Sequence, residues 1–209
     1  MHHASAASPG TRRVPTTAAG QELAAICRSL EAGDNRYFGR RPEEQLRQRL
    51  ATGGLPPAAE LEARRALGRE LLELGKPADA IVELEAALDL ARGSGAAQEV
   101  VLDLIALQGL AHLQAAEDTN CISMHTAASC ILPILPEGVH RQPEHARKAG
   151  DLFLAFLEQI PRSLQTAWLL DLSRMISGDY PEGVPEPYRL PPGRFAEDAS
   201  ARRWIDRGV

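Results

Sequence analysis

The fold is decided by residues 61–91, which have the sequence LEARRALGRELLELGKPADAIVELEAALDLA. This stretch contains two segments, Leu61–Leu74 and Ala78–Ala91, in which apolar residues recur every three or four positions. Such spacing is typical of an amphipathic helix that buries one face. Gly75-Lys76-Pro77 separates the segments, and a glycine followed closely by a proline interrupts a helix. We therefore expect a helical hairpin.

The hairpin has the residue pattern of a tetratricopeptide repeat, a helix pair of about 34 residues in which small side chains allow close packing. Six positions fit this pattern: Gly68, Leu71, Gly75, Ala80, Leu84 and Ala87. Arg64 replaces the large aromatic residue expected near the start, and Arg92 replaces the closing proline. With only four Phe, three Tyr and two Trp in 209 residues, the composition also disfavours a β-sandwich or barrel.

The rest of the chain extends this all-α prediction to about three repeat units. We expect a flexible leader over residues 1–20, a helical-repeat domain over residues 21–178, and a Pro-rich extended tail over residues 179–209. Pro143–Gln159 has the spacing of a second helix of a repeat, and Leu164–Ser177 that of a following first helix.

The second of the predicted repeat units contains the residues that are candidates for metal binding or catalysis. Aligning Gly109 with Gly68 predicts a second helix that presents Cys121 and His125 at inward positions. Thiolate and imidazole are good ligands for zinc, copper or iron. A four-ligand set is available in Cys121, His125, Cys130 and His140, although its spacing is not that of a zinc finger.

Geometry restricts that metal site. On an unbroken helix Cys130 would lie about half a turn out of phase with Cys121 and about 13 Å along the axis. A shared ion, or a Cys121–Cys130 disulfide, therefore requires the helix to end before Cys130. Two alternatives stay open: the cysteines are packing residues beside a hydrogen-bonded core histidine, or Cys121 or Cys130 forms a nucleophilic pair with His125.

Charge and hydropathy exclude several classes of partner. The formal net charge is −5, and no basic stripe suits a nucleic-acid backbone. No apolar run is long enough for a transmembrane helix, and the first residues lack the apolar core of a signal peptide. We therefore expect a cytoplasmic protein with neither membrane nor nucleic acid as its partner.

Several short motifs resemble those of bacterial tetratricopeptide proteins related to cartilage acidic protein 1, over roughly residues 55–195. The motifs are Asn120-Cys121, His125, Ser129-Cys130-Ile131, Pro133-Ile134, Gly138-Val139-His140, Trp168-Leu169-Leu170 and Gly178-Asp179-Tyr180-Pro181-Glu182-Gly183-Val184-Pro185, with Tyr188. In that family the helical repeats precede an FG-GAP β-propeller and an ASPIC/UnbV module. The present chain ends where the propeller would begin, so the resemblance implies a repeat region that works alone or beside a separate propeller protein.

Three functions follow as expectations. The first is an accessory subunit that docks a separate ASPIC/UnbV propeller-type partner and contributes the Cys/His site, in a natural-product tailoring pathway as the resemblance implies. The second is a tailoring enzyme that uses copper, iron or zinc bound by Cys121, His125, Cys130 and His140. The third is a structural protein-interaction adaptor whose cysteines only pack.

Overall fold

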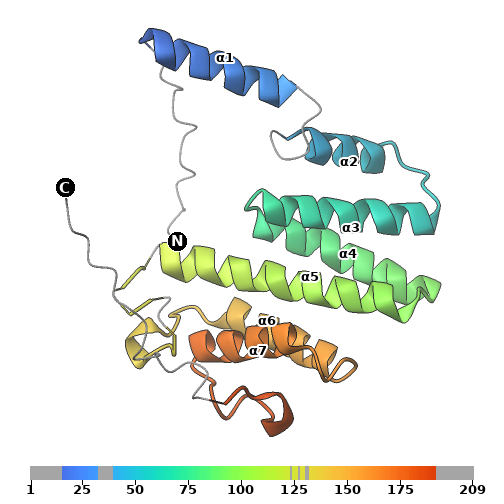
Figure 1. Cartoon of the computed structure of the whole chain (residues 1–209). Coiled ribbons are helices and arrows are strands. Elements are labelled where there is room, and N and C mark those ends of the chain that lie inside the picture. Colours follow the sequence, from blue (N-terminus) through green and yellow to red (C-terminus); the bar gives the residue numbers. More distant parts are fainter. Residues whose placement is uncertain (1–15, 33–39, 123, 127, 130–131, 192–209) are drawn as a thin grey trace, which may run out of the picture. The chain divides into compact units, whose positions relative to one another are not determined.

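The computed structural model describes residues 16–32, 40–122, 124–126, 128–129 and 132–191. These residues form seven α-helices and no strand, which confirms the all-α prediction for the described part of the chain (Figure 1). The helices are α1 (Ala18–Ala32), α2 (Arg41–Ala51), α3 (Pro57–Glu73), α4 (Pro77–Ser94), α5 (Gln98–Glu117), α6 (Glu144–Leu157) and α7 (Leu164–Ser177). None of them is long and apolar enough to cross a membrane.

The chain divides into two compact units, residues 1–45 and residues 46–209. The first unit contains α1, which begins at Ala18 and thus includes the last residues of the expected leader. Most of that leader, residues 1–15, lies outside the described residues. The second unit contains α3 to α7 and holds the candidate site.

In the second unit, α3 and α4 form the hairpin that the sequence predicts. Gly75 adopts a φ of 66° after α3, a conformation that glycine takes without steric cost, and Pro77 begins α4. Gly68 allows the two helices to approach closely, because a Cβ there would lie 2.5 Å from Leu84 Cγ. The spacing of small and large residues in the sequence therefore corresponds to a direct helix–helix contact.

The next hairpin pairs α5 with α6, and here the predicted second helix through Cys121 and His125 is wrong. After α5 the chain makes a short π-helical turn at Asp118–Ile122. The described residues between this turn and α6 form turns, bends and a short 3₁₀-helix (Pro136–Gly138). The helix that packs on α5 is α6: a Cβ on Gly109 would lie 2.5 Å from Phe153 Cε1. We call residues 118–143 the insert loop.

Competing hydrogen bonds explain why α5 ends early. Thr119 Oγ1 donates to the carbonyl of Ala115 at 2.8 Å, and Asn120 Nδ2 donates to that of Ala116 at 2.9 Å. Side chains of this kind offer the backbone an alternative to helical hydrogen bonds. Further along the insert loop, Pro133 and Pro136 lack the N–H that a helix interior requires.

The segment after α7 closes the second unit instead of extending away from it. Gly178 ends α7 with a φ of 78°, and residues 179–191 form turns and a short 3₁₀-helix (Glu186–Tyr188). Val184 is fully buried among the side chains of α6 and α7, and the backbone N–H of Leu190 donates to Asp171 Oδ2 at 3.0 Å. This part of the predicted extended tail is therefore a packed cap, which we call the C-terminal strap, while residues 192–209 lie outside the described residues.

Candidate functional site

The two ends of the insert loop are tied together by one amide side chain. Asn120 Nδ2 donates to the carbonyl of Gln142 at 3.0 Å, and the N–H of Gln142 donates to Asn120 Oδ1 at 2.9 Å. Asn120 is buried, and its Nδ2 also donates to the end of α5. A buried amide with these three hydrogen bonds fixes both ends of the loop against α5.

A second tie holds the returning part of the loop against α7. The N–H of His140 donates to the carbonyl of Ile176 at 2.8 Å. Two residues earlier, Gly138 lies so close to the carbonyl of Ala128 that a Cβ would come within 2.6 Å of its oxygen. The backbone leading to and through His140 is therefore held by neighbouring parts of the fold.

These ties bring Cys121 and His140 into contact. Cys121 Sγ lies 3.5 Å from His140 Nε2. The imidazole is 7% exposed, and burial lowers the pKa of His140, which favours the neutral ring. Its Nδ1 is buried and has no hydrogen-bond partner among the described residues. Because a buried N–H without an acceptor is costly, we infer that the ring proton is on Nε2 and is donated to the sulfur.

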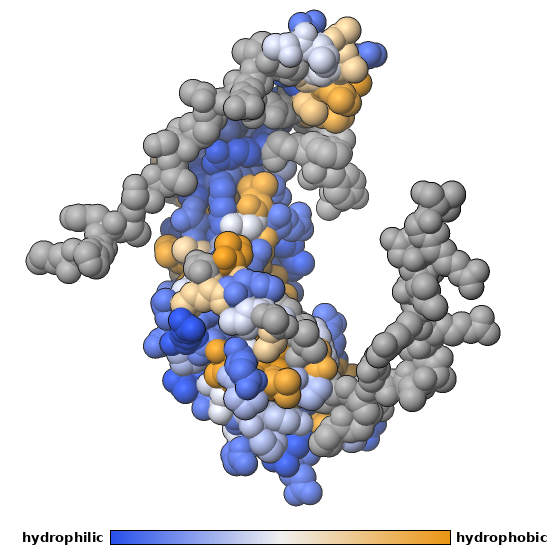
Figure 2. Space-filling view, turned by 90° about the vertical axis from the view of Figure 1, so that its left-hand side faces the viewer, coloured by the Kyte–Doolittle hydropathy of each residue, from blue (hydrophilic) through white to orange (hydrophobic). Residues whose placement is uncertain are grey.

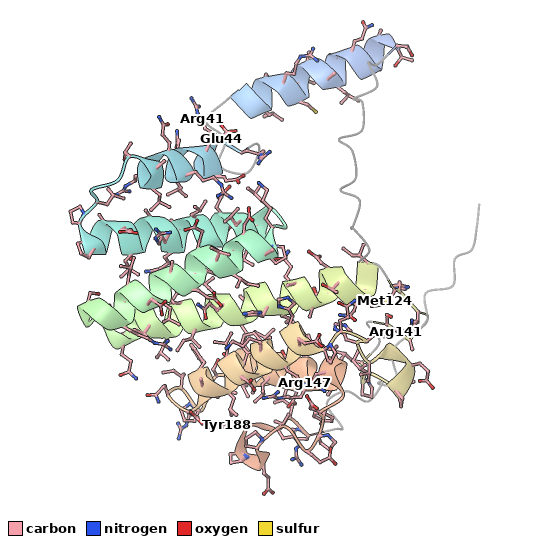
Figure 3. All side chains as sticks on the ribbon, turned by 180° about the vertical axis from the view of Figure 1, so that it is seen from behind. Arg41, Glu44, Met124, Arg141, Arg147 and Tyr188 are labelled. Carbon is pink, nitrogen blue, oxygen red and sulfur yellow. The ribbon has the colours of Figure 1, made fainter. Side chains whose placement is uncertain are left out.

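Beside this pair lies a small cavity of about 20 Å³. A volume of that order holds roughly one water-sized particle. The cavity is lined by Asn120, Cys121, Met124, Thr126, Ser129, Glu137, Gly138, Val139, His140 and Arg141. Figure 3 labels Met124 and Arg141, which come from the two sides of the loop. The arrangement can accommodate an ion or a water, and it has no room for an organic substrate.

The structure brings together two of the four residues that the sequence predicts as metal ligands. Cys121 and His140 meet, whereas His125 is exposed and is not among the residues that line the cavity. Cys130 lies outside the described residues. Among the described residues no three His, Cys, Asp or Glu side chains are placed to hold one ion.

Two residues of the site, Asn120 and Met124, are not identified by sequence reasoning. Asn120 belongs to a motif that gives it no structural role. The signal that the sequence offers is its place at the end of a helix, before a long segment that contains Pro133 and Pro136. Nothing in the sequence marks Met124 as a site residue, because the ligands considered there are the thiols of cysteine and the imidazoles of histidine.

A pair of histidines, His112 and His145, lies between α5 and α6. Nδ1 of His112 and Nδ1 of His145 are 2.9 Å apart, so the two rings share one proton. Burial, followed by the charges of His145 and Lys148, lowers the pKa of His112 to about 4. The pair is therefore a packed contact whose second protonation is unfavourable.

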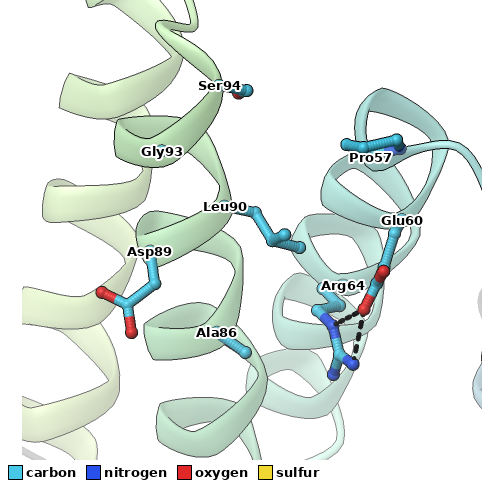
Figure 4. Close-up of a pocket in the computed structure, with 8 residues that line it drawn as sticks. All are labelled: Pro57, Glu60, Arg64, Ala86, Asp89, Leu90, Gly93 and Ser94. Atoms are coloured by element: carbon cyan, nitrogen blue, oxygen red, sulfur yellow. Dashed lines mark hydrogen bonds and ion pairs between the residues drawn. The ribbon is translucent and has the colours of Figure 1, made fainter.

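A groove with a volume of about 630 Å³ lies between α3 and α4 (Figure 4). Leu90 forms part of its apolar wall. Its lining contains the cation Arg64, which is held at 2.8 Å by both Glu60 and Glu83. Because these ion pairs already neutralise Arg64, its guanidinium is not available to a ligand of the groove.

Neither a protein-family model, nor a curated protein, nor a solved structure matches this chain.

Proposed function

We propose that the chain is a helical-repeat accessory subunit that docks a separate ASPIC/UnbV propeller-type protein through the insert loop and contributes a Cys/His site to the complex. The α3–α4 and α5–α6 hairpins, each with a glycine against a large side chain of the second helix, support a tetratricopeptide-like interpretation. The resemblance of the loop motifs to the cartilage acidic protein 1 group supports the choice of partner. A role in natural-product tailoring rests on the same resemblance.

One observation carries the proposal: the insert loop is anchored at its ends yet exposes large apolar side chains. Ile122, next to Cys121, is 77% exposed, and Leu135 is 54% exposed. Figure 2, which views the side on which the loop lies in Figure 1, shows apolar residues among hydrophilic ones there. A constrained loop that presents exposed apolar groups is typical of a recognition surface.

The test is a titration of the intact chain with a purified propeller-type protein encoded beside it, followed by size-exclusion chromatography and calorimetry. We expect a defined complex that Ile122→Asp and Leu135→Asp each weaken about tenfold or more, since each places a charge in an apolar contact. Val82→Asp is the matched control, because Val82 is similarly exposed (64%) but lies on α4.

Two results would refute the proposal. The first is the absence of any complex when both proteins are present at tens of micromolar, roughly ten times a micromolar dissociation constant. The second is a complex that Val82→Asp weakens as much as the two loop substitutions do.

A further inference from the structure

The Cys121–His140 contact has the dimensions of two ligands on one ion. In a tetrahedral site with metal–sulfur and metal–nitrogen bonds of about 2.3 Å and about 2.0 Å, sulfur and nitrogen lie about 3.5 Å apart. The observed separation of Sγ and Nε2 is 3.5 Å. An ion can therefore replace the proton between these atoms without a change in the positions of Cys121 and His140.

A second sulfur atom at this cavity belongs to a methionine. Met124 follows the π-helical turn, and its N–H donates to the carbonyl of Asn120 at 2.9 Å, one residue before Cys121. It lines the same cavity of about 20 Å³ as Cys121 and His140. The cavity thus brings together a thioether, a thiol and an imidazole.

We propose that Cys121, Met124 and His140 form a binding site for a monovalent copper ion. Thiolate and thioether ligands favour soft ions such as Cu(I), which also binds imidazole. Binding releases one proton: the Cys121 S–H bond breaks, a Cu–S bond forms, and that proton passes to solvent. The His140 proton moves from Nε2 to Nδ1, so that the Nε2 lone pair is free to bind copper. The Cu–N bond must offset the cost of a buried Nδ1–H that has no acceptor among the described residues. No change of oxidation state is involved. This inference rests on the proposed role of the loop as the carrier of the Cys/His site, and it replaces His125 of the sequence-based set by Met124.

The loop supplies further conditions for such a site. The hydrogen bonds of the Asn120 amide hold the backbone next to Cys121, and the bond from the His140 N–H to Ile176 holds His140. Two of the three ligands are therefore held in place before the ion binds, which lowers the entropic cost of assembling the site.

The experiment is an anaerobic titration of the full chain with Cu(I), supplied as its acetonitrile complex, in competition with bicinchoninate. A parallel titration uses zinc sulfate. All proteins carry Cys27→Ser and Cys130→Ser, because each of these thiols is a Cu(I) ligand outside the proposed set. We expect one tightly held Cu(I) per chain, with an ultraviolet thiolate-to-copper absorption band.

Three variants separate the ligands. Met124→Leu, which keeps the size of the side chain, lowers Cu(I) affinity about tenfold and leaves zinc affinity unchanged, because zinc disfavours thioethers. Cys121→Ser abolishes the absorption band. His125→Ala is the control in the same loop and leaves copper binding unchanged. Circular dichroism confirms that each variant is folded.

The proposal is overturned if bicinchoninate keeps all the copper, if Met124→Leu binds Cu(I) as tightly as its parent, or if His125→Ala lowers the affinity instead. These outcomes are distinguishable from failure of the docking proposal. Loss of copper binding with an intact propeller complex removes the metal site alone, and the reverse result removes the docking surface alone.

Discussion

At the scale of single residues, the two glycines that face large side chains set the spacing of the helix pairs. Gly109→Ala places a methyl group 2.5 Å from the ring of Phe153. Because the ring is fully buried and packed on α5, it has little room to move. We expect a loss of about 1–3 kcal/mol in the free energy of unfolding, measured by urea denaturation.

Gly93→Ala is the matched control for that substitution. Gly93 lies in α4, and a Cβ added to it would have no other atom within 4 Å, so alanine gains helix propensity without a clash. We expect this variant to gain up to about 1 kcal/mol. Equal effects of the two substitutions would show that packing against Phe153 is not what makes Gly109 necessary.

The His112–His145 contact makes stability depend on pH. The pKa of His112 is about 4 in the folded chain, below the 6.5 of an ordinary histidine, because burial disfavours the charged ring. The unfolded chain therefore binds the proton first, and stability present above pH 6.5 is lost as the pH falls through 4. The free energy of unfolding falls by about 3 kcal/mol at most.

Urea denaturation at pH values from neutral down to the pKa of about 4 checks this prediction. His112→Gln removes the titrating group, and we expect its stability to change less with pH than that of the unmodified chain. The exposed His125→Gln serves as the control and keeps the original slope. An unchanged slope in His112→Gln would show that other groups cause the acid sensitivity.

At the scale of elements, the insert loop depends on Asn120. Asn120→Ala removes three hydrogen bonds to the ends of the loop and leaves the Gln142 N–H and two carbonyls without these partners. We expect a loss of about 1–3 kcal/mol and faster amide hydrogen exchange over residues 118–143. Thr52→Ala, which removes a hydrogen bond at the exposed end of α2, is the control and leaves exchange in the loop unchanged. Unchanged exchange in the Asn120 variant would mean that the amide is not the tie.

The same element shows where sequence reasoning succeeds and where it fails. The helical spacing of apolar residues, together with the glycine and proline residues that interrupt it, predicted the α3–α4 hairpin, α6 and α7. These signals lie within or next to the helices themselves. Sequence reasoning failed for the second hairpin, since the partner of Gly109 is Phe153 and lies beyond the whole insert loop. Helical spacing paired Cys121 with His125, whereas the fold pairs Cys121 with His140, 19 residues away in sequence.

At the scale of the whole molecule, the C-terminal strap completes the core of the second unit. Val184 is fully buried, and Tyr180, Tyr188 and Leu190 pack against the same cluster. Terminal caps of this kind protect the last helices of stacked helical arrays from solvent.

Truncation tests the role of the strap. A chain of residues 1–178 loses the strap, whereas a chain of residues 1–191 keeps it and is the reference. We expect the shorter chain to be less stable by at least about 2 kcal/mol, the value of one fully buried valine. Equal melting temperatures of the two chains would show that the strap is not part of the core.

The role of the insert loop as the docking surface for a propeller-type partner is tested most directly by amide hydrogen exchange. The full chain is measured with and without the purified propeller-type protein. On complex formation we predict slower amide exchange within residues 118–143 and unchanged amide exchange in α3 and α4. Slower exchange confined to α3 and α4, or no change anywhere in the chain, would contradict that role.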